Sequence, residues 1–147
     1  MTQYLLFEAG GLKLAAFSDL VKAVHERLNV QPVAGTCSWF RGLAVAHGKL
    51  LPVTDLGEFA VRRLSTGRTL ELNPTVGIVG LQVDRILGLS HAQVSEVPLT
   101  GIERVLQLET RLGLTERAVV QEDRVYRLLD IAALVQSSGF ITIADHG

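Results

Sequence analysis

The chain is a succession of short apolar segments separated by glycine, proline or aspartate, and this pattern constrains its fold more than any other feature. Apolar runs flank the dipeptides Gly10-Gly11, His47-Gly48 and Glu122-Asp123, each of which is placed to form a tight hairpin turn. Short strands at even spacing, with few long helical patterns, are typical of all-β barrels and sandwiches. The sequence therefore predicts a mostly β fold built from hairpins.

Three segments have helical features. Residues 18–28 fit either a helix or a single helical turn followed by an alternating strand, and periodicity does not separate the two. Residues 101–113 are ambiguous in the same way. The clearest helix follows Asp130, which can cap its first turn while Ile131 and Leu134 share one apolar face.

Three aspartates, Asp55, Asp84 and Asp130, occur where an apolar strand ends or bends. An aspartate at such a position usually accepts hydrogen bonds from the backbone N–H groups of the following turn. We therefore expect all three to stabilise turns and to take no part in proton transfer.

The composition excludes several classes of protein. Lys and Arg number 14 against 15 Asp and Glu, so no basic surface for nucleic acid or anionic lipid is expected. No apolar run approaches the ~20 residues of a membrane span. The high mean hydropathy, +0.31, fits either a partner-binding face or a Leu- and Val-rich core. The single cysteine, Cys37, and the absence of a signal-type N-terminus predict a protein of the reducing cytoplasm.

The residues that catalysis would need are scattered. None of the four histidines has metal-ligand spacing, and Cys37 has no Cys-x-x-Cys partner. His47 and Asp55 lie about 25 Å apart if a single strand connects them, which is too far for an acid–base pair. We expect no catalytic residue, no cofactor and no metal, and hence a protein that is not an enzyme.

One group of residues indicates protein binding instead. Trp39, Phe40 and Arg41 precede the hairpin centred on His47-Gly48. Tryptophan, phenylalanine and arginine often anchor protein interfaces, where a buried one can contribute ~2 kcal/mol or more. The alternative is that the two aromatic residues fill the core.

The order of motifs along the chain resembles that of the CheW-like domain, the scaffold module of bacterial chemosensory arrays. The resemblance covers Tyr4 to Val135 and is carried by four motifs: YLLFEAGGLKLAAF, FRGLAVAHGKLLPVTDL, GLQVDRI and RLLDIAAL. It implies two five-stranded SH3-like β-barrels with a groove between them, plus short helices. We place the CheW-like domain, with its two sub-barrels, at residues 1–138, and a C-terminal tail or added strand at residues 139–147.

The resemblance also implies a function in signal transduction by a two-component system. Proteins of this kind are adaptors that bridge the cytoplasmic tip of a chemoreceptor to the regulatory domain of a CheA-like histidine kinase. The family commonly has Asn-Leu-Arg-Gly where this chain has VAHG, ending in His47-Gly48. Histidine is mostly neutral at pH 7, whereas arginine is a fixed charge. In this region the chain resembles the divergent adaptors of the type IV pilus (twitching-motility) branch.

The family's contact regions fall on Val21 and Ala23 and on His47 with its hairpin. Together with the aromatic segment they define the candidate protein-interaction residues: Val21, Ala23, Trp39, Phe40, Arg41 and His47. The alternative function is a domain that senses a small ligand or signal on the same scaffold. The apolar segment GIVGLQV and Arg85 would then line a pocket in the groove.

Overall fold

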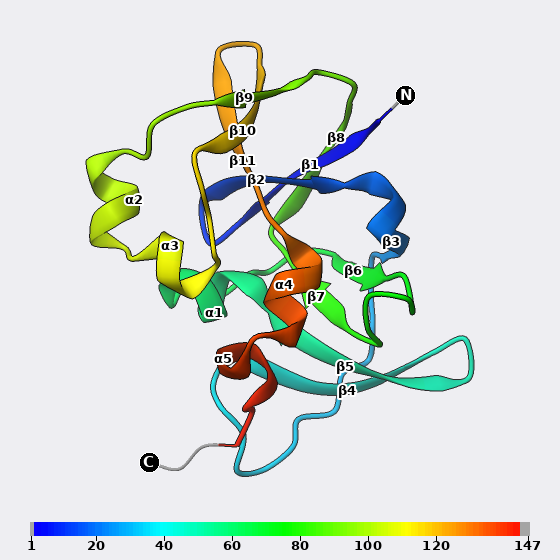
Figure 1. The fold of residues 1–147 in the computed structure, drawn as a ribbon. Helices are drawn as coiled ribbons and strands as arrows, with labels where there is room; N and C mark the ends of the chain where they lie inside the picture. The colour runs from blue at the N-terminus through cyan, green and yellow to red at the C-terminus, as the bar shows by residue number, and fades with distance from the viewer. Residues whose placement is uncertain (1, 145–147) are drawn as a thin grey trace.

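The computed structural model describes residues 2–144, and within them two β-sheets lie one above the other with short helices at their side (Figure 1). The first sheet has six strands in the order β8-β1-β2-β11-β10-β9. Its strands are β1 (Tyr4–Ala9), β2 (Leu12–Phe17), β8 (Arg85–Ser90), β9 (Val94–Glu96), β10 (Arg117–Gln121) and β11 (Arg124–Leu128).

The second sheet has five strands in the order β3-β6-β7-β5-β4. Its strands are β3 (Val21–His25), β4 (Phe40–Ala46), β5 (Lys49–Asp55), β6 (Thr69–Leu72) and β7 (Gly80–Gln82). The chain thus begins in the first sheet, builds the whole second sheet, and returns to complete the first. The predicted mostly β, two-part architecture is confirmed.

The three predicted hairpins are present. They connect β1 to β2 at Gly10-Gly11, β4 to β5 at His47-Gly48, and β10 to β11 at Glu122-Asp123. Both turn residues of every hairpin have positive φ, the requirement of a type I′ turn. The backbone of these turns twists in the same sense as the flanking strands, so each turn sets the register of its hairpin.

The ambiguous segments adopt short helices. Residues 18–20 form a single 3₁₀ turn that leads into β3, so the second of the two interpretations of residues 18–28 is correct. The helices are α1 (Leu56–Val61), α2 (Gly101–Val105), α3 (Leu108–Arg111), α4 (Ile131–Gln136) and α5 (Ser138–Ile141). No helix among residues 2–144 has the length and apolar character to span a bilayer.

Two of the three aspartates stabilise the turns that follow them, as expected. Asp55 is fully buried, and its carboxylate accepts hydrogen bonds from the backbone N–H groups of Glu58 and Ser65 at 2.9–3.1 Å. Asp130 caps α4 by accepting from the N–H of Ala133 at 3.0 Å. Asp84, between β7 and β8, differs from the expectation: it accepts from the N–H of Gly11 in the first hairpin, at 3.3 Å, and not from the turn that follows it.

A common apolar core joins the two sheets. It contains Phe7 and Leu14 of the first sheet, Leu70 and Leu81 of the second, and apolar residues of the helices. All four of these side chains are fully buried, and burial of each contributes about 1.5–3 kcal/mol. The sheets are therefore held against one another as one packed unit.

The end of the chain packs onto this unit. Residues 138–141 form α5, and Phe140 lies in the common core. Ala144 forms an isolated β-bridge with Thr36. The last residues of the segment that we assigned to a tail or an added strand, 145–147, lie outside the described residues. The division of the chain at residue 138 stays a prediction.

Candidate functional site

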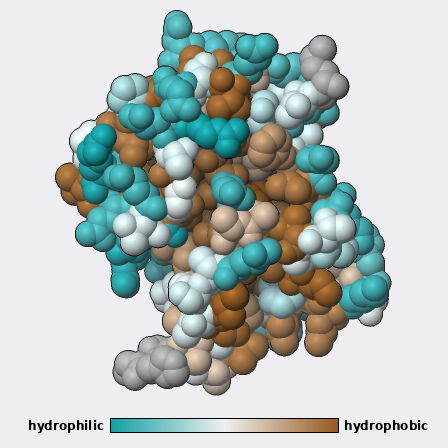
Figure 2. Space-filling view, in the orientation of Figure 1, coloured by the Kyte–Doolittle hydropathy of each residue, from teal (hydrophilic) through white to brown (hydrophobic). Residues whose placement is uncertain are grey.

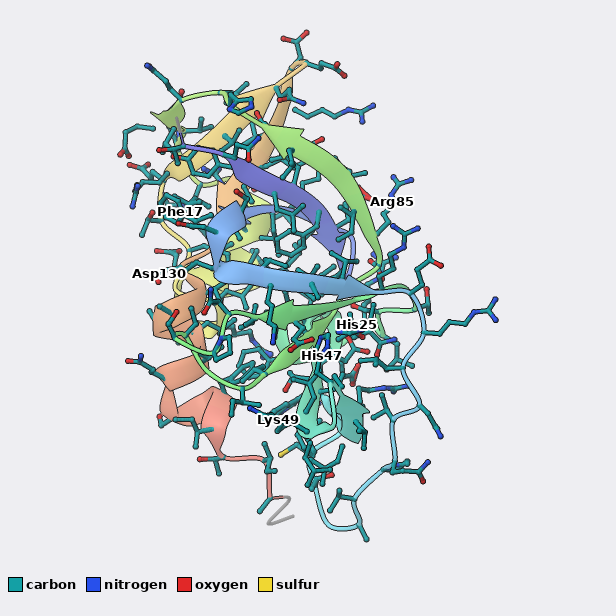
Figure 3. The ribbon with its side chains drawn as sticks, turned by 90° about the vertical axis from the view of Figure 1, so that its right-hand side faces the viewer. Phe17, His25, His47, Lys49, Arg85 and Asp130 are labelled. Carbon is teal, nitrogen blue, oxygen red and sulfur yellow. The ribbon has the colours of Figure 1, made fainter. Side chains whose placement is uncertain are left out.

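The second sheet carries the predicted interaction residues, and its curvature brings some of them together. In the strand order, β3 and β4 are at opposite edges. Even so, the rings of His25 on β3 and His47 at the end of β4 have their centroids 5.9 Å apart. The sheet is therefore curled into a barrel, and the β4–β5 hairpin tip lies over the end of β3 (Figure 3).

On β3, the side chains alternate between partial burial and exposure. Val21 and Ala23 are partly buried, and Val21 packs against the common core. Val24 is 42% exposed. A partner that approaches β3 from solvent therefore meets Val24 more directly than Val21.

The aromatic pair at the start of β4 is mostly inside the fold. Phe40 is only 7% exposed, so it fills the core, which was the alternative interpretation of this pair. Trp39 is partly buried and packs edge-on against Phe59, with ring centroids 5.1 Å apart, and against Phe140 at 6.2 Å. Arg41 is exposed. A role for these three residues in binding a partner stays a prediction. Phe40 is the least accessible of them to a partner.

An exposed apolar surface lies on the β4–β5 hairpin and was not among the predicted residues. Val45 and Leu50 are directly opposite one another in the antiparallel pair, so their side chains lie on one face. They are 65% and 62% exposed. Ile78, 59% exposed, lines the same hollow as Leu50. We call these three residues the hairpin patch; Figure 2 shows apolar side chains gathered over this lower sheet.

Two lysines lie at the rim of the hairpin patch, and the Glu71 carboxylate lines the same hollow. Lys22 and Lys49 are exposed and line the same hollow of about 320 Å³ as Leu50 and Ile78. Alternation along β4 could have revealed the patch, because Val45 lies between the buried residues Ala44 and Ala46.

A polar cluster forms where the hairpin tip meets β3 and β6. Glu71, on β6, has its Oε1 atom 2.7 Å from His25 Nε2 and 3.2 Å from His47 Nε2, and its Oε2 atom is 3.7 Å from Lys22 Nζ. Burial raises the pKa of the Glu71 carboxyl, but the hydrogen bond to His25 and the charges of His47 and Lys22 lower it by more. The net pKa lies below the usual value, so this carboxylate is ionised at neutral pH.

A hollow of about 590 Å³ lies beside Trp39, between α1, α3 and the start of α5. Phe59, Arg62, Arg111 and Glu58 also line it, so it combines aromatic walls with two basic side chains and one acidic side chain. Arg85, which we expected at a pocket, instead forms an ion pair with Glu8 at 2.6 Å.

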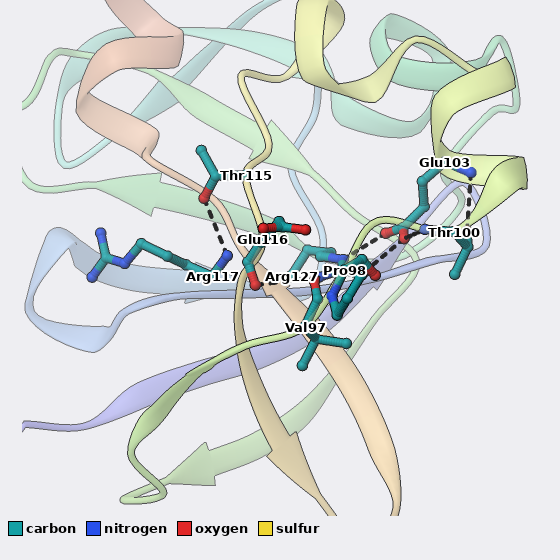
Figure 4. Close-up of polar contacts among 8 residues, drawn as sticks. All are labelled: Val97, Pro98, Thr100, Glu103, Thr115, Glu116, Arg117 and Arg127. Carbon is teal, nitrogen blue, oxygen red and sulfur yellow. Dashed lines mark hydrogen bonds and ion pairs between the residues drawn. The ribbon is translucent and has the colours of Figure 1, made fainter.

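A second ion pair has a structural role. Arg127, on β11, is almost fully buried and donates two hydrogen bonds to the Glu103 carboxylate, at 2.7 and 2.8 Å (Figure 4). Glu103 also accepts from the backbone N–H of Thr100, which completes a capping box at α2. The hydrogen bond from Arg127 lowers the pKa of Glu103. Both oxygens of the Glu103 carboxylate accept hydrogen bonds from Arg127, and this ion pair therefore holds α2 to the first sheet.

Comparison with known proteins identifies relatives of the whole chain. The family model of the CheW-like domain matches residues 3–139. Protein PilI of Pseudomonas aeruginosa is 29% identical over 143 residues, which cover 94% of this chain and 78% of PilI. Chemotaxis protein CheW of Thermotoga maritima is 24% identical over 143 residues, covering 91% of this chain and 87% of the relative.

The fold also has a counterpart among solved structures. The scaffolding protein TtCheW from Thermoanaerobacter tengcongensis superimposes with a TM-score of 0.71, at 16% identity and with 94% of each chain covered. At this identity the likeness shows the fold alone. The predicted fold, two SH3-like barrels with short helices, is confirmed.

Proposed function

The chain belongs to the CheW-like domain family, and from this premise we propose that it is a non-enzymatic adaptor coupling chemoreceptors to a CheA-like histidine kinase. The family is one of scaffold and adaptor proteins. The observation that carries the proposal is the hairpin patch, an apolar surface with a basic rim on the second barrel.

The hairpin patch has the properties of a docking surface. Val45 and Leu50 extend from paired strands whose backbone is held by the ladder, so a partner meets a preorganised surface. Burial of exposed apolar side chains against a partner is favourable in free energy. An interface of ~800 Å² per partner is sufficient for specific binding. The matching partner surface is apolar with an acidic rim, because Lys22 and Lys49 flank the patch.

We assign this surface to the regulatory domain of the kinase. The receptor contact then involves β3 with Val21 and Ala23 and the adjacent His47, the regions that the resemblance implied. Coupling would be geometric: a change at the receptor alters the placement of the kinase. In an array of many copies, modest interfaces add up through multivalency. Such a complex operates in the cytoplasm, where receptor tips and kinases meet.

The test is co-purification of the chain with the C-terminal regulatory region of a CheA-like histidine kinase from the same organism, with Kd measured by calorimetry. Val45→Lys is expected to weaken binding about thirtyfold, because an aliphatic residue at an interface centre contributes ~2 kcal/mol. Val105→Lys is the matched control, since Val105 is 81% exposed on α2, which packs with the first sheet through the Glu103–Arg127 pair. Equal affinities of the two variants, with unchanged thermal melts, would refute the assignment.

We further propose that the chain serves the twitching-motility branch of these systems. The similarity to Protein PilI, 29% against 24% for the chemotaxis protein CheW, supports this branch. His47-Gly48, in place of the family's Arg-Gly, supports it too. Pull-down of receptors from pilus and flagellar systems in parallel would decide between the branches: preferential capture of the flagellar receptor would contradict the proposal.

A second candidate function, sensing of a small ligand, is supported by the hollow beside Trp39. Its volume, about 590 Å³, is within the range of small-molecule sites, and Arg62 and Arg111 would select an anionic ligand. A screen of small organic acids by thermal shift, without any kinase, tests it. A ligand that raises the melting temperature of the wild type but not of an Arg62→Gln variant supports sensing; no shift with any acid in the screen contradicts it.

A further inference from the structure

We propose that His25, His47 and Glu71 form a binding site for a divalent transition-metal ion of the zinc type. One ligand atom from each residue lies within 4.8 Å of the other two. Two imidazoles and one carboxylate are a frequent ligand set for zinc, and imidazole also suits copper and nickel. The inference does not rest on the adaptor role, because it concerns the barrel end alone.

Two of the three distances between the ligand atoms are close to those that a metal requires, and the two histidine ligand atoms lie within 4.8 Å of one another. Zinc bonds of 2.0–2.2 Å in a tetrahedral arrangement place neighbouring ligand atoms ~3.3 Å apart. Glu71 Oε1 is 3.2 Å from His47 Nε2, already at this spacing, and 2.7 Å from His25 Nε2. A small opening of the second contact is enough to admit the ion, and the side chain of His47, 54% exposed, is free to adjust.

The backbone holds all three residues in place. Glu71 is paired with Ala23 across β3 and β6, so it is a diagonal neighbour of His25 on the same face. His47 occupies the first turn position of the β4–β5 hairpin with φ 54°, and the type I′ turn fixes its backbone while the imidazole can still rotate. The ligands thus come from paired strands and a tight turn, which reduces the entropy lost on binding an ion.

Lys22 completes the surroundings of the cluster. Its Nζ atom is 3.7 Å from Glu71 Oε2, the carboxylate oxygen that faces away from the two histidines. Lys22 can keep this contact while Oε1 binds the metal, in the way that charged or hydrogen-bonding groups commonly orient a ligating carboxylate. The side chain of His47 is open to solvent, so water would occupy the remaining coordination position.

The test is calorimetric titration of the full chain with zinc chloride, after removal of any affinity tag and treatment with a chelator. The expected result is one zinc per chain, with an affinity that falls at least tenfold in His47→Gln and in Glu71→Gln. Two matched controls are His91→Gln, at the end of the first sheet, where the His91 ring contacts Gln3 at 3.1 Å, and His146→Gln, at a position outside the described residues. Both controls are expected to bind zinc as the wild type does.

Cobalt provides a second readout that does not depend on heats of binding. Wild type with Co²⁺ is expected to show the visible absorption of a tetrahedral nitrogen–oxygen site, and His47→Gln to lose it while keeping the wild-type circular dichroism. The proposal is overturned if wild type shows no saturable binding at zinc concentrations on the order of 1 mM. It is also overturned if His91→Gln or His146→Gln abolishes binding, or if His47→Gln leaves it intact.

Discussion

Replacement of Arg127 by methionine should destabilise the fold strongly, because this side chain organises the packing of α2 on the first sheet. The Arg127 side chain is 4% exposed, and its guanidinium donates two hydrogen bonds to the Glu103 carboxylate. It also donates to the backbone carbonyls of Val97, Pro98 and Glu116. Methionine retains the apolar stem but none of these hydrogen bonds.

The magnitude follows from what remains after the substitution. The Glu103 carboxylate, 16% exposed, would lose its cationic partner and keep only the backbone N–H of Thr100. Breaking a buried ion pair in this way costs about 3–5 kcal/mol, and the partial exposure of Glu103 favours the lower end. A loss of about 3 kcal/mol corresponds to a fall in melting temperature of roughly 6–12 °C for a chain of this size.

The assay is urea unfolding of four proteins: wild type, Arg127→Met, Glu103→Gln and the double variant. Glu103→Gln keeps an oxygen for Thr100, so it removes the charge with little effect on the capping box. The cycle should give a coupling energy above about 1 kcal/mol between the two residues. Arg124→Met is the matched control: Arg124 is exposed on the same strand and should change stability by less than about 0.5 kcal/mol.

The pH dependence sharpens this test. Arg127 holds the pKa of folded Glu103 below the unfolded value of about 4.3. The stability from the pair is therefore present above about pH 4.3 and is lost as the pH falls through the folded pKa. The difference between wild type and Arg127→Met should shrink in that acidic range. A difference that is constant down to the lowest measurable pH, or a coupling energy below about 0.5 kcal/mol, would refute the reasoning.

Two further predictions concern the backbone. Gly42→Ala should cost more than about 3 kcal/mol in urea unfolding, because a Cβ there would lie 2.0 Å from the Gln31 carbonyl oxygen at φ 131°; Gly48→Ala, with open space around it, should cost only about 1–2 kcal/mol, and equal costs would contradict the clash. Asp130→Ala should lower the free energy of unfolding by about 1 kcal/mol, because it removes a single capping hydrogen bond. Asp55→Ala should lower it by clearly more, because Asp55 is fully buried. A larger fall in melting temperature for Asp130→Ala than for Asp55→Ala would show that burial of the aspartate does not determine the loss of stability.

The hairpins and the capping aspartates were predictable because neighbouring residues alone determine them. A type I′ turn needs two residues at positive φ, and the flanking apolar segments need only pair with one another, as at Gly10-Gly11. Asp130 is similar: its acceptor meets the N–H three residues later in the same turn. Both interactions form within a few residues, so local sequence is sufficient information.

Other features depend on residues far away in the chain. The segment after Ser18 becomes a strand because β3 pairs with β6, whose residues lie some way along the sequence. Phe40, the first residue of β4, is buried, whereas Trp39, which precedes the strand, is only partly buried; the aromatic character that they share does not distinguish them. Sequence periodicity predicts neither the conformation of β3 nor the burial of Phe40, because tertiary pairing selects between local structures of similar energy.

By itself, the sequence determined the β class, the hairpin turns, the capping aspartates and, through the order of its motifs, the family. Only the tertiary structure decided which surface is exposed and which polar groups meet. His25, His47 and Glu71 are far apart in the chain and carry no spacing motif; they meet because the second sheet curls until its two edges approach. Curvature of a sheet is a cooperative result of twist and core packing, and no single segment encodes it.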